Sequence, residues 1–337
     1  MKAYVLYAVN DFRYEDVRFP DCPSGWAIVK VRAAGICSSD IARVFTKGTY
    51  HFPTIPGHEF AGEVYCVADE EYFSLVGKKV GVFPLIPCRE CPQCQNKHYE
   101  MCEHYDYVGS RRDGGFAEYV AVPVWNLVEL PDSIPFTSAA MLEPLSVALH
   151  AVKVGGVKKG DRVAIIGTGM IGISAGQWAY KKGASDVTVL GRNENKRAIV
   201  EKCGLNYEVC TKLEDLKQYD FVLEAVGSPQ AIEMAISATV PGGTVLLMGN
   251  PSGDIQLKQE IYWRILRKQL TLKGTWNSKY DGINPSDWTD AVKAIVDCEI
   301  NVEPLISHCY PQEKLKDGLK LMFEHKDPYC KVMTVWK

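Results

Sequence analysis

Residues 163–180 have the sequence VAIIGTGMIGISAGQWAY, in which a short apolar run leads directly into the pattern G-x-G-x-x-G. The run Val163–Ile166 is typical of a buried strand, and an apolar helix pattern opens after it. Gly167, Gly169 and Gly172 permit a tight turn, close approach of the backbone to a pyrophosphate, and close packing of the helix. Because a strand precedes these glycines and a helix follows, the stretch predicts a dinucleotide site with phosphates at the helix N-terminus. The alternative is a glycine-rich turn that binds nothing.

The next predicted strand ends without the acidic residue that usually selects NAD. NAD sites commonly carry a carboxylate about 20 residues after the glycines, where it binds the ribose 2′-hydroxyl. Here the strand Asp186–Leu190 is followed by Gly191 and Arg192. Gly191 leaves room, and Arg192 offers a guanidinium fork for a phosphate. We therefore expect NADP to be favoured, or at least accepted, unless Arg192 stacks on adenine or faces water.

The alternation of strand and helix continues from about residue 145 to about residue 280. Runs typical of strands are Val163–Ile166, Val187–Leu190, Phe221–Ala225, Thr244–Met248 and Leu270–Leu272. Between them lie helix candidates at Ile171–Lys182, Asn195–Cys203, Pro229–Ala238 and Gln259–Lys268. The pattern predicts an α/β domain of the Rossmann type, a doubly wound parallel sheet with helices on both faces. We place this domain at residues 148–284.

The remainder of the chain has a different character. Before residue 145, short strand patterns such as Trp26–Arg32 and Gly62–Val67 alternate with Gly- and Pro-rich connections. The segment after Pro285 continues as a helix and then a strand at Lys331–Val335, and it is too short to be a domain. We therefore expect residues 1–147 and 285–337 to form one β-rich domain, into which the nucleotide domain is inserted.

Composition and charge narrow the class of protein. The 337 residues are 47% hydrophobic and 23% charged, as in ordinary globular proteins of about two domains. The formal net charge of −3 gives no basic excess for nucleic acid or an anionic membrane surface. We find no membrane-spanning run, and the N-terminal segment MKAYVLYAVNDFRYED becomes acidic too early for a signal peptide. These features predict a cytoplasmic protein that binds small molecules, not nucleic acid or membrane.

Four of the twelve cysteines are clustered in one short segment. Cys88, Cys91, Cys94 and Cys102 have the spacing C-x2-C-x2-C-x7-C. Zinc takes four tetrahedral thiolates, and a closed set of four sulfurs leaves no open position, so we predict a structural zinc ion. The alternatives are four buried thiols, an iron–sulfur cluster, or a zinc-finger module, for which the basic residues are lacking.

Three further segments offer ligands for a second metal ion. They are GICSSD at 35–40, PGHEFAG at 56–62 and LEP at 142–144. A thiolate from Cys37, an imidazole from His58 and a carboxylate from Glu143 would leave the fourth zinc position open for substrate or water. Each residue taken singly is more often part of a packed core.

Taken together, the motifs resemble those of the zinc-dependent medium-chain alcohol and polyol dehydrogenases over essentially the full chain. The matching motifs are G-x-C-x-S-D at 35–40, G-H-E-x-x-G at 57–62, the cysteine loop at 88–102, L-E-P at 142–144 and G-x-G-x-x-G at 167–172. The resemblance implies a GroES-like β-rich catalytic domain with two zinc ions and a Rossmann domain that binds NAD or NADP. Glu143 gives the third ligand position a glutamate, and in this respect the chain resembles the polyol branch of the family.

The same resemblance assigns roles to neighbouring residues. Ser39 would receive or relay the proton of a substrate hydroxyl bound to the catalytic zinc. Asp40 would orient His58 through its other ring nitrogen. Glu59 is expected to be a transient ligand or a group directly behind the ligands. The dinucleotide contacts that the resemblance implies are Gly167, Gly169, Met170, Ile171, Gly172, Gly191, Arg192 and Val226.

The outer end of the proton relay is left open by the sequence. The imidazole that ends the relay in some relatives falls at Ala42. His51 on a nearby loop is a candidate, although an ordinary surface histidine is the more common case.

The resemblance is greatest to the branch that oxidises polyol phosphates. It rests on residues 84–88, 105–119 and 265–276. This implies oxidation of a polyol phosphate to a ketose phosphate, with galactitol 1-phosphate and tagatose 6-phosphate as the expected pair. Cations for the phosphate would come from Arg111, Arg112, Arg43 and Lys279, each of which is otherwise a solvated charge or an ion-pair partner.

Three other interpretations stay open at this stage. In the first, the substrate is an unphosphorylated polyol of the sorbitol type. In the second, it is a pentitol phosphate. Outside the enzymes, the chain is a non-catalytic zinc- and nucleotide-binding redox sensor. Family members are homodimers or homotetramers, and the apolar strand at 270–275 offers an edge for pairing across a two-fold axis.

Overall fold

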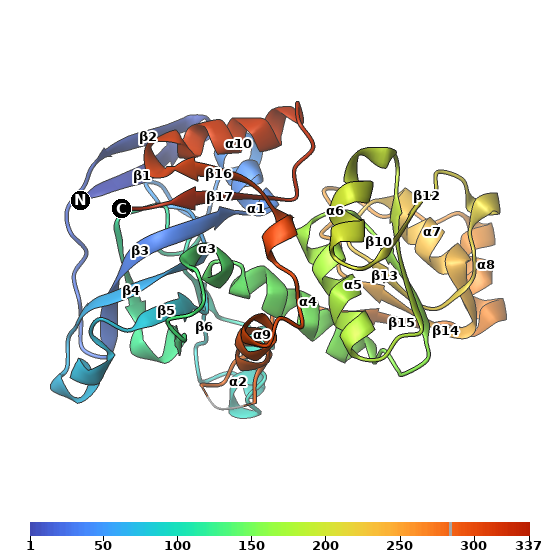
Figure 1. Cartoon of the computed structure of the whole chain (residues 1–337), viewed down its shortest axis with the longest axis horizontal. Coiled ribbons are helices and arrows are strands. Elements are labelled where there is room, and N and C mark those ends of the chain that lie inside the picture. The colour runs from blue at the N-terminus through green and yellow to red at the C-terminus, as the bar shows by residue number, and fades with distance from the viewer. Residues whose placement is uncertain (283–284) are drawn as a thin grey trace. The chain divides into compact units, whose positions relative to one another are not determined.

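The computed structural model describes residues 1–282 and 285–337 and divides the chain into two compact units (Figure 1). The first unit comprises Met1–Pro144, Lys279–Val296 and Ile306–Lys337, and the second comprises Leu145–Ser278 and Asp297–Leu305. The domain boundaries expected from the sequence, 147/148 and 284/285, remain predictions. Residue 284, at the second of them, lies outside the described residues.

The second unit is built on a parallel sheet with the strand order β12-β11-β10-β13-β14-β15. Its strands are β10 (Arg162–Ile166), β11 (Asp186–Gly191), β12 (Asn206–Val209), β13 (Tyr219–Glu224), β14 (Thr239–Leu247) and β15 (Thr271–Gly274). The helices are α5 (Met170–Lys181), α6 (Arg197–Lys202), α7 (Pro229–Ala238) and α8 (Gln259–Lys268), with α5 and α6 on one face and α7 and α8 on the other (Figure 1). The α/β fold expected from the alternation is confirmed.

β10 and β13 are neighbours at the centre of the sheet. From β10 the chain adds β11 and β12 on one side, and from β13 it adds β14 and β15 on the other, so the strand order reverses between β10 and β13. Val163 on β10 pairs with Val187 on one side and with Phe221 on the other. In open α/β sheets, ligands bind outside the carboxyl ends of the strands at this reversal. Gly167 follows β10 directly, so the G-x-G-x-x-G segment lies at that position of the second unit.

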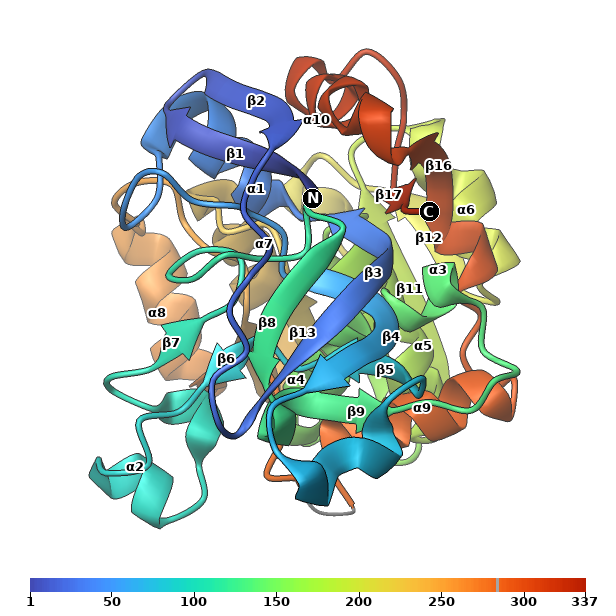
Figure 2. The same ribbon diagram turned by 90° about the vertical axis from the view of Figure 1, so that its left-hand side faces the viewer.

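The first unit is built around a larger, mainly antiparallel sheet with the order β16-β17-β3-β4-β5-β9, in which β8 also pairs with β3 (Figure 2). Its strands are β3 (Trp26–Ile36), β4 (Glu59–Val67), β5 (Lys79–Val82), β8 (Tyr119–Pro123), β9 (Leu127–Glu129), β16 (Ile306–Pro311) and β17 (Lys331–Val335). Two small pairs accompany it, β1 (Lys2–Ala8) with β2 (Asp11–Asp16) and β6 (Leu85–Ile86) with β7 (Asp106–Tyr107).

Helices in or entering the first unit are mostly short. They are α1 (Ser38–Ala42), the π-helix η1 (Arg43–Lys47), α2 (Pro92–Gln95), α3 (Phe136–Ala139), α9 (Asp287–Val296) and α10 (Leu315–Glu324). A further helix, α4 (Leu142–Gly155), begins in the first unit and continues into the second. Strand β17 pairs antiparallel with β3, Val332 opposite Ile36, so the C-terminal segment belongs to the sheet that carries the N-terminal motifs.

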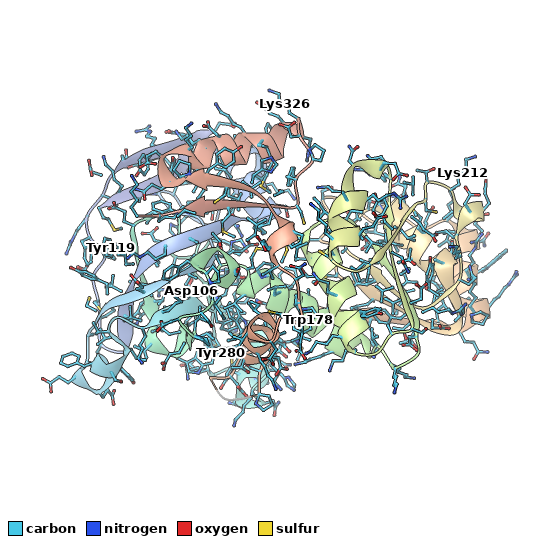
Figure 3. All side chains as sticks on the ribbon, viewed as in Figure 1. Asp106, Tyr119, Trp178, Lys212, Tyr280 and Lys326 are labelled. Carbon is cyan, nitrogen blue, oxygen red and sulfur yellow. The ribbon has the colours of Figure 1, made fainter. Side chains whose placement is uncertain are left out.

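Each unit has its own apolar core. In the first, residues such as Val29, Phe60 and Phe116 are almost completely buried among the strands. In the second, Trp178 is buried and its indole N–H donates to the carbonyl of Leu145 at 3.0 Å (Figure 3). A search of the described residues for a helix both long and apolar enough to cross a bilayer found none.

Candidate active site and metal centres

Antiparallel pairing of β3 and β4 brings the first two ligand motifs together. Gly35 near the end of β3 lies opposite Glu59 at the start of β4. Cys37 follows β3 and caps the N-terminus of α1, while His58 directly precedes β4. A thiol and an imidazole that are 21 positions apart in the chain therefore meet at one edge of the sheet.

The donor atoms of Cys37, His58 and Glu59 all lie within 4.8 Å of one another. His58 and Glu59 are buried, and Cys37 is partly exposed. Sulfur, nitrogen and carboxylate oxygen are the donors that zinc takes, and three protein donors are the number found in catalytic zinc sites, which keep one position open. The residues present therefore fit a zinc ion.

Glu143, predicted from the sequence as the third ligand, lies beside this group and is not part of it. It occupies the first turn of α4, is buried, and its Oε1 accepts a hydrogen bond from the hydroxyl of Tyr107 at 3.3 Å. Burial, followed by the negative charge of Glu59, raises the pKa of Glu143 to about 7. The structure thus offers two carboxylates, with Glu59 nearer to Cys37 and His58, and the assignment of the third ligand stays a prediction.

Acidic side chains gather around the donors in a buried region. Asp40, Glu59 and Glu143 are all buried there. Lys331 pairs with Glu59 and Arg43 pairs with Asp40, which leaves Glu143 without an ion-pair partner of its own among the described residues. Since buried carboxylates are costly without a counter-charge, a divalent ion among these donors would stabilise the group.

A short network connects the residues predicted to move or direct the proton. Asp40 Oδ2 accepts the backbone N–H of Cys37 at 3.0 Å, and Asp40 Oδ1 lies 3.6 Å from Nδ1 of His58. Arg43 donates to Asp40 Oδ1 at 2.9 Å and to Ser39 Oγ at 2.8 Å. At this distance Asp40 and His58 are not hydrogen-bonded, and Nδ1 of His58 has no hydrogen-bond partner among the described residues, so the orienting role of Asp40 stays a prediction.

The side chain of His51, a candidate for the outer end of the proton relay, makes contacts with nearby backbone carbonyl groups. The His51 side chain is exposed, and its ring nitrogens face the carbonyl oxygens of Pro53 at 3.1 Å and Arg111 at 3.0 Å. These contacts hold the ring against the neighbouring loop of the first unit.

The candidate phosphate cations lie in different places. Arg43 is at the donor group, whereas Arg111 and Arg112 line a groove of about 750 Å³ whose lining contains none of the predicted metal ligands. Arg111 stacks between the rings of Tyr50 and Tyr105, and Arg112 pairs with Asp106. The side chain of Lys279 is exposed. The structure thus brings only Arg43 next to the metal donors.

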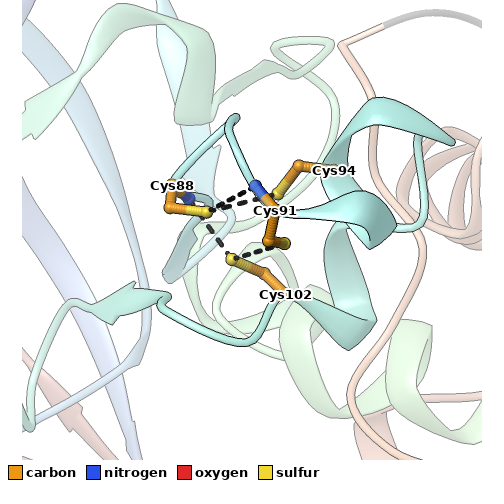
Figure 4. A group of neighbouring side chains, drawn as sticks. All are labelled: Cys88, Cys91, Cys94 and Cys102. Atoms are coloured by element: carbon orange, nitrogen blue, oxygen red, sulfur yellow. Dashed lines mark hydrogen bonds between the residues drawn. The ribbon is translucent and has the colours of Figure 1, made fainter.

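The four clustered cysteines converge on one point (Figure 4). Sγ atoms of Cys88 and Cys94 are 3.9 Å apart, and those of Cys91 and Cys102 are 4.0 Å apart. Four sulfurs at zinc–sulfur distances of about 2.3 Å form a tetrahedron with edges of about 3.8 Å, so the spacing fits a bound zinc ion and is too long for disulfides.

The environment of the cluster shifts the pKa values of its thiols in opposite directions, down for Cys88 and Cys91 and up for Cys94 and Cys102. Backbone N–H groups of Glu103 and Cys94 lower the pKa of Cys91 to about 6, while burial raises the pKa of Cys94. Four thiolates this close repel one another unless a cation lies between them. A divalent ion removes that conflict, because coordination deprotonates thiols outright.

The glycines of the dinucleotide segment are required by close approaches in the second unit. Gly167 has a φ of 124°, outside the range that side chains tolerate, and Gly169 caps the N-terminus of α5. A Cβ atom on Gly172 would collide with the carbonyl oxygen of Gly167. Met170 and Ile171 form the first turn of α5, so the backbone N–H groups there are available to a phosphate.

Two residues that the sequence did not single out shape the rest of this segment. A Cβ atom on Gly191 would collide with the hydroxyl of Tyr207, which donates to the carbonyl of Asn193. Glu224 is fully buried, and its Oε1 accepts the backbone N–H groups of Val226 and Gly227 at 2.7 Å each. Tyr207 therefore fills the space beside Gly191, and Glu224 fixes the loop that presents Val226.

Comparison with known proteins agrees with this architecture. The model of the alcohol dehydrogenase GroES-like domain matches residues 23–132, and that of the zinc-binding dehydrogenase domain matches residues 171–297. Galactitol 1-phosphate 5-dehydrogenase of Escherichia coli K12 is 34% identical over 290 residues, covering 83% of this chain and 84% of that protein. Sorbitol dehydrogenase of Bacillus subtilis 168 is 27% identical over 351 residues, covering 99% and 97%.

Solved structures give the same result. The crystal structure of galactitol-1-phosphate dehydrogenase from Escherichia coli has a TM-score of 0.90 and 31% identity, covering 99% of this chain and all of that one. A protein of Sinorhizobium meliloti 1021, named as a zinc-binding dehydrogenase and solved with NADP, has a TM-score of 0.89 and 27% identity, covering 99% and 98%. The chain belongs to the zinc-binding alcohol and polyol dehydrogenase family, whose members are oxidoreductases acting on CH–OH groups.

Two residues near the donor group, Tyr107 and Lys331, were not predicted as functional from the sequence. Tyr107 contacts Glu143, and its ring lies 5.8 Å from that of His58, centroid to centroid. Lys331 reaches Glu59 from the C-terminal strand, 272 positions away in the chain. Nothing local in the sequence marks either residue, because only the pairing of β17 with β3 brings Lys331 to the donor group.

Proposed function

We propose that this protein transfers hydride between a polyol phosphate and NAD(P), with galactitol 1-phosphate and tagatose 6-phosphate as the substrate pair. The proposal is carried by the convergence of Cys37, His58 and Glu59, with Ser39 two residues after the cysteine. The similarity to galactitol 1-phosphate 5-dehydrogenase supports the choice of substrate.

In this proposal, zinc is held by Cys37, His58 and one of the two carboxylates, Glu59 or Glu143. The bound ion supplies Lewis acidity, which lowers the pKa of a hydroxyl group at its open position. The cluster of Cys88, Cys91, Cys94 and Cys102 holds a second, structural zinc ion.

The chain's own residues direct the proton and hold the cofactor. Ser39 Oγ takes up the proton of the substrate hydroxyl while its own hydroxyl proton passes on to solvent, and Asp40, 3.6 Å from Nδ1, keeps the imidazole of His58 in a fixed orientation. A bound nicotinamide dinucleotide would supply the hydride acceptor, and Gly167–Gly172 at the N-terminus of α5 would hold its pyrophosphate. Gly191 and Arg192 favour NADP, because β11 ends in Gly191 in place of the acid that binds a ribose 2′-hydroxyl, and the Arg192 side chain is exposed.

A second candidate substrate is an unphosphorylated polyol of the sorbitol type. It is favoured by one observation: Arg43, the only candidate phosphate cation at the donor group, is already paired with Asp40. A pentitol phosphate is the remaining alternative within the polyol phosphates.

Initial rates distinguish these substrates. Galactitol 1-phosphate, free galactitol, sorbitol and a pentitol phosphate are each supplied with saturating NAD and, separately, NADP. We expect the highest kcat/KM with galactitol 1-phosphate and a preference for NADP. Equal or higher rates with a free polyol would identify a sorbitol-type enzyme, and no turnover by protein with bound zinc would favour the non-catalytic redox sensor.

The exposed edge of the second unit supports a homo-oligomer. Strand β15 ends the sheet with all four residues exposed, and Leu272 is among them. Because an exposed strand edge is a template for pairing, we expect β15 to pair with its copy in a second chain, giving a homodimer or a homotetramer. Sedimentation of the wild type and of Leu272→Pro tests this, since proline removes a backbone donor from the edge.

A further inference from the structure

The chain changes its helical winding at Arg43. Helix α1 ends at Ala42, and the next turn, Arg43–Lys47, is a π-helix. Such turns are rare and frequently occur at functional sites. In this one, the side chain of Arg43 folds back over α1, so that one of its terminal nitrogens, Nη1, reaches both Ser39 and Asp40.

Asp40 gathers three partners at a fully buried carboxylate. Its two oxygens face the backbone N–H of Cys37, the guanidinium of Arg43 and Nδ1 of His58. Arg43 therefore helps to hold the Asp40 carboxylate in place beside the metal-binding imidazole.

The contact with Ser39 has a defined polarity. An arginine side chain carries donors and no acceptors, so the bond from Nη1 makes Ser39 Oγ the acceptor. The hydroxyl proton of Ser39 must then point away from Arg43. The adjacent positive charge also stabilises negative charge on Ser39 Oγ. Arg43 cannot take a proton onward, so the relay does not pass through it.

We infer that Arg43 is a positioning residue for hydride transfer, which fixes the orientation of the Ser39 hydroxyl and the position of the Asp40 carboxylate, and that it does not bind the substrate phosphate. This inference rests on the proposed function, since it gives Ser39 and Asp40 their part in that reaction. It replaces the role in phosphate binding that the sequence suggested for Arg43.

Kinetics of Arg43→Ala and Arg43→Lys separate the two roles. A positioning role predicts that kcat falls by about 100-fold in Arg43→Ala for phosphorylated and free polyols alike, the size expected for loss of proton-transfer geometry. The KM ratio between galactitol 1-phosphate and galactitol stays unchanged. Arg43→Lys recovers part of kcat, because one ammonium can reach Ser39 or Asp40 but lacks the planar fork. A selective rise in KM for the phosphate ester, with kcat retained, overturns the inference.

Rescue by added guanidinium ion excludes a purely structural effect. Millimolar guanidinium restores part of kcat in Arg43→Ala if the missing group acts by charge and hydrogen bonding at Ser39 and Asp40. The matched control is Arg32→Gln, which breaks another arginine–carboxylate pair of the first unit, Arg32–Glu63 at 2.8 Å, outside the site. Arg32→Gln keeps wild-type kcat and does not respond to guanidinium. Absence of rescue in folded Arg43→Ala contradicts the inference.

A spectroscopic measurement keeps the inference testable if the proposed function fails. Cobalt(II) replaces zinc at the site, and its visible absorption reports the arrangement of Cys37 and His58. We expect Arg43→Ala, and Arg43→Lys to a smaller extent, to shift these bands through Asp40, and Arg32→Gln to leave them unchanged. Wild type that binds cobalt but oxidises no polyol refutes the proposed function alone. Unchanged bands in folded Arg43→Ala refute the action of Arg43 on the site.

Discussion

The ammonium of Lys331 and the carboxylate of Glu59 form an ion pair inside the first unit, with side chains 4% and 2% exposed. Lys331 also donates to the carbonyl of Ile36 at 3.3 Å, next to Cys37. Because Glu59 is also one of the three clustered metal donors, its carboxylate is shared between a fixed cation of the protein and the metal position.

Lys331→Met should separate these two partners of Glu59. In zinc-depleted protein, the variant leaves a buried carboxylate without its counter-ion, and we expect a loss of about 3–5 kcal/mol in the free energy of unfolding. In zinc-loaded protein the loss shrinks, because the ion supplies the missing charge. Urea unfolding of both forms measures the difference. Arg32→Met, which breaks a more exposed pair, serves as the control with about 0–1 kcal/mol. Equal losses with and without zinc would contradict this account.

Glu143 should make the zinc-free protein less stable as pH rises. Its pKa in the folded protein is about 7, against a usual value of 4.5. Between these values the folded state holds a proton that the unfolded state has released, so stability falls as pH increases through this window, by about 3 kcal/mol in total. Glu143→Gln should remove this dependence. Urea unfolding from pH 4 to pH 8 tests it, and a wild-type profile that matches the variant would be evidence against a buried, protonatable Glu143.

Cys91→Ser should remove one of two zinc ions and leave the other. Three remaining sulfurs bind zinc more weakly, and the loop from Cys88 to Cys102 has little regular structure to hold it apart from α2 and the single 3-10 turn Tyr99–Met101. Elemental analysis is expected to give one zinc per chain together with a lowered Tm. Cys309→Ser, at an exposed position, is the control and should keep both ions. Iron and sulfide in place of zinc would instead identify an iron–sulfur cluster.

Arg192→Ala should weaken NADP binding selectively. If Arg192 binds the 2′-phosphate, its removal costs about 1–3 kcal/mol, which corresponds to a rise in KM of about 5- to 150-fold for NADP and little change for NAD. Arg197→Ala is a control in the same unit, because Arg197 is held by Glu194 and Glu201. Equal changes for both cofactors would place Arg192 in solvent or on the adenine.

Local pattern was enough to predict the features that depend on neighbouring residues in the chain. Helices α7 and α8 begin and end at the expected residues, 229–238 and 259–268. The glycine segment is similarly local, because strand, turn and helix are consecutive. Strand β12 was missed, since Asn206–Val209 is short and partly polar and is a strand through its pairing with β11.

The parts of the site that the sequence did not predict all depend on contacts between segments that are far apart in the chain. The sequence predicted Glu143 as the third ligand, whereas β4 places Glu59 nearer to Cys37 and His58, which no local pattern indicates. Tyr207 beside Gly191 and Lys331 beside Glu59 have no sequence signal. The pairing of β12 with β11 brings in Tyr207, and Lys331 comes from β17, which is separated from β4 by β3.

The most direct test is the rate of reduced-nicotinamide formation from galactitol 1-phosphate by wild type and by His58→Ala, at matched content of the structural zinc. We predict turnover by the wild type and none by the variant, which should hold one zinc ion fewer per chain. Equal turnover by both proteins would show that hydride transfer does not depend on the metal donors at Cys37, His58 and Glu59, and would contradict the account.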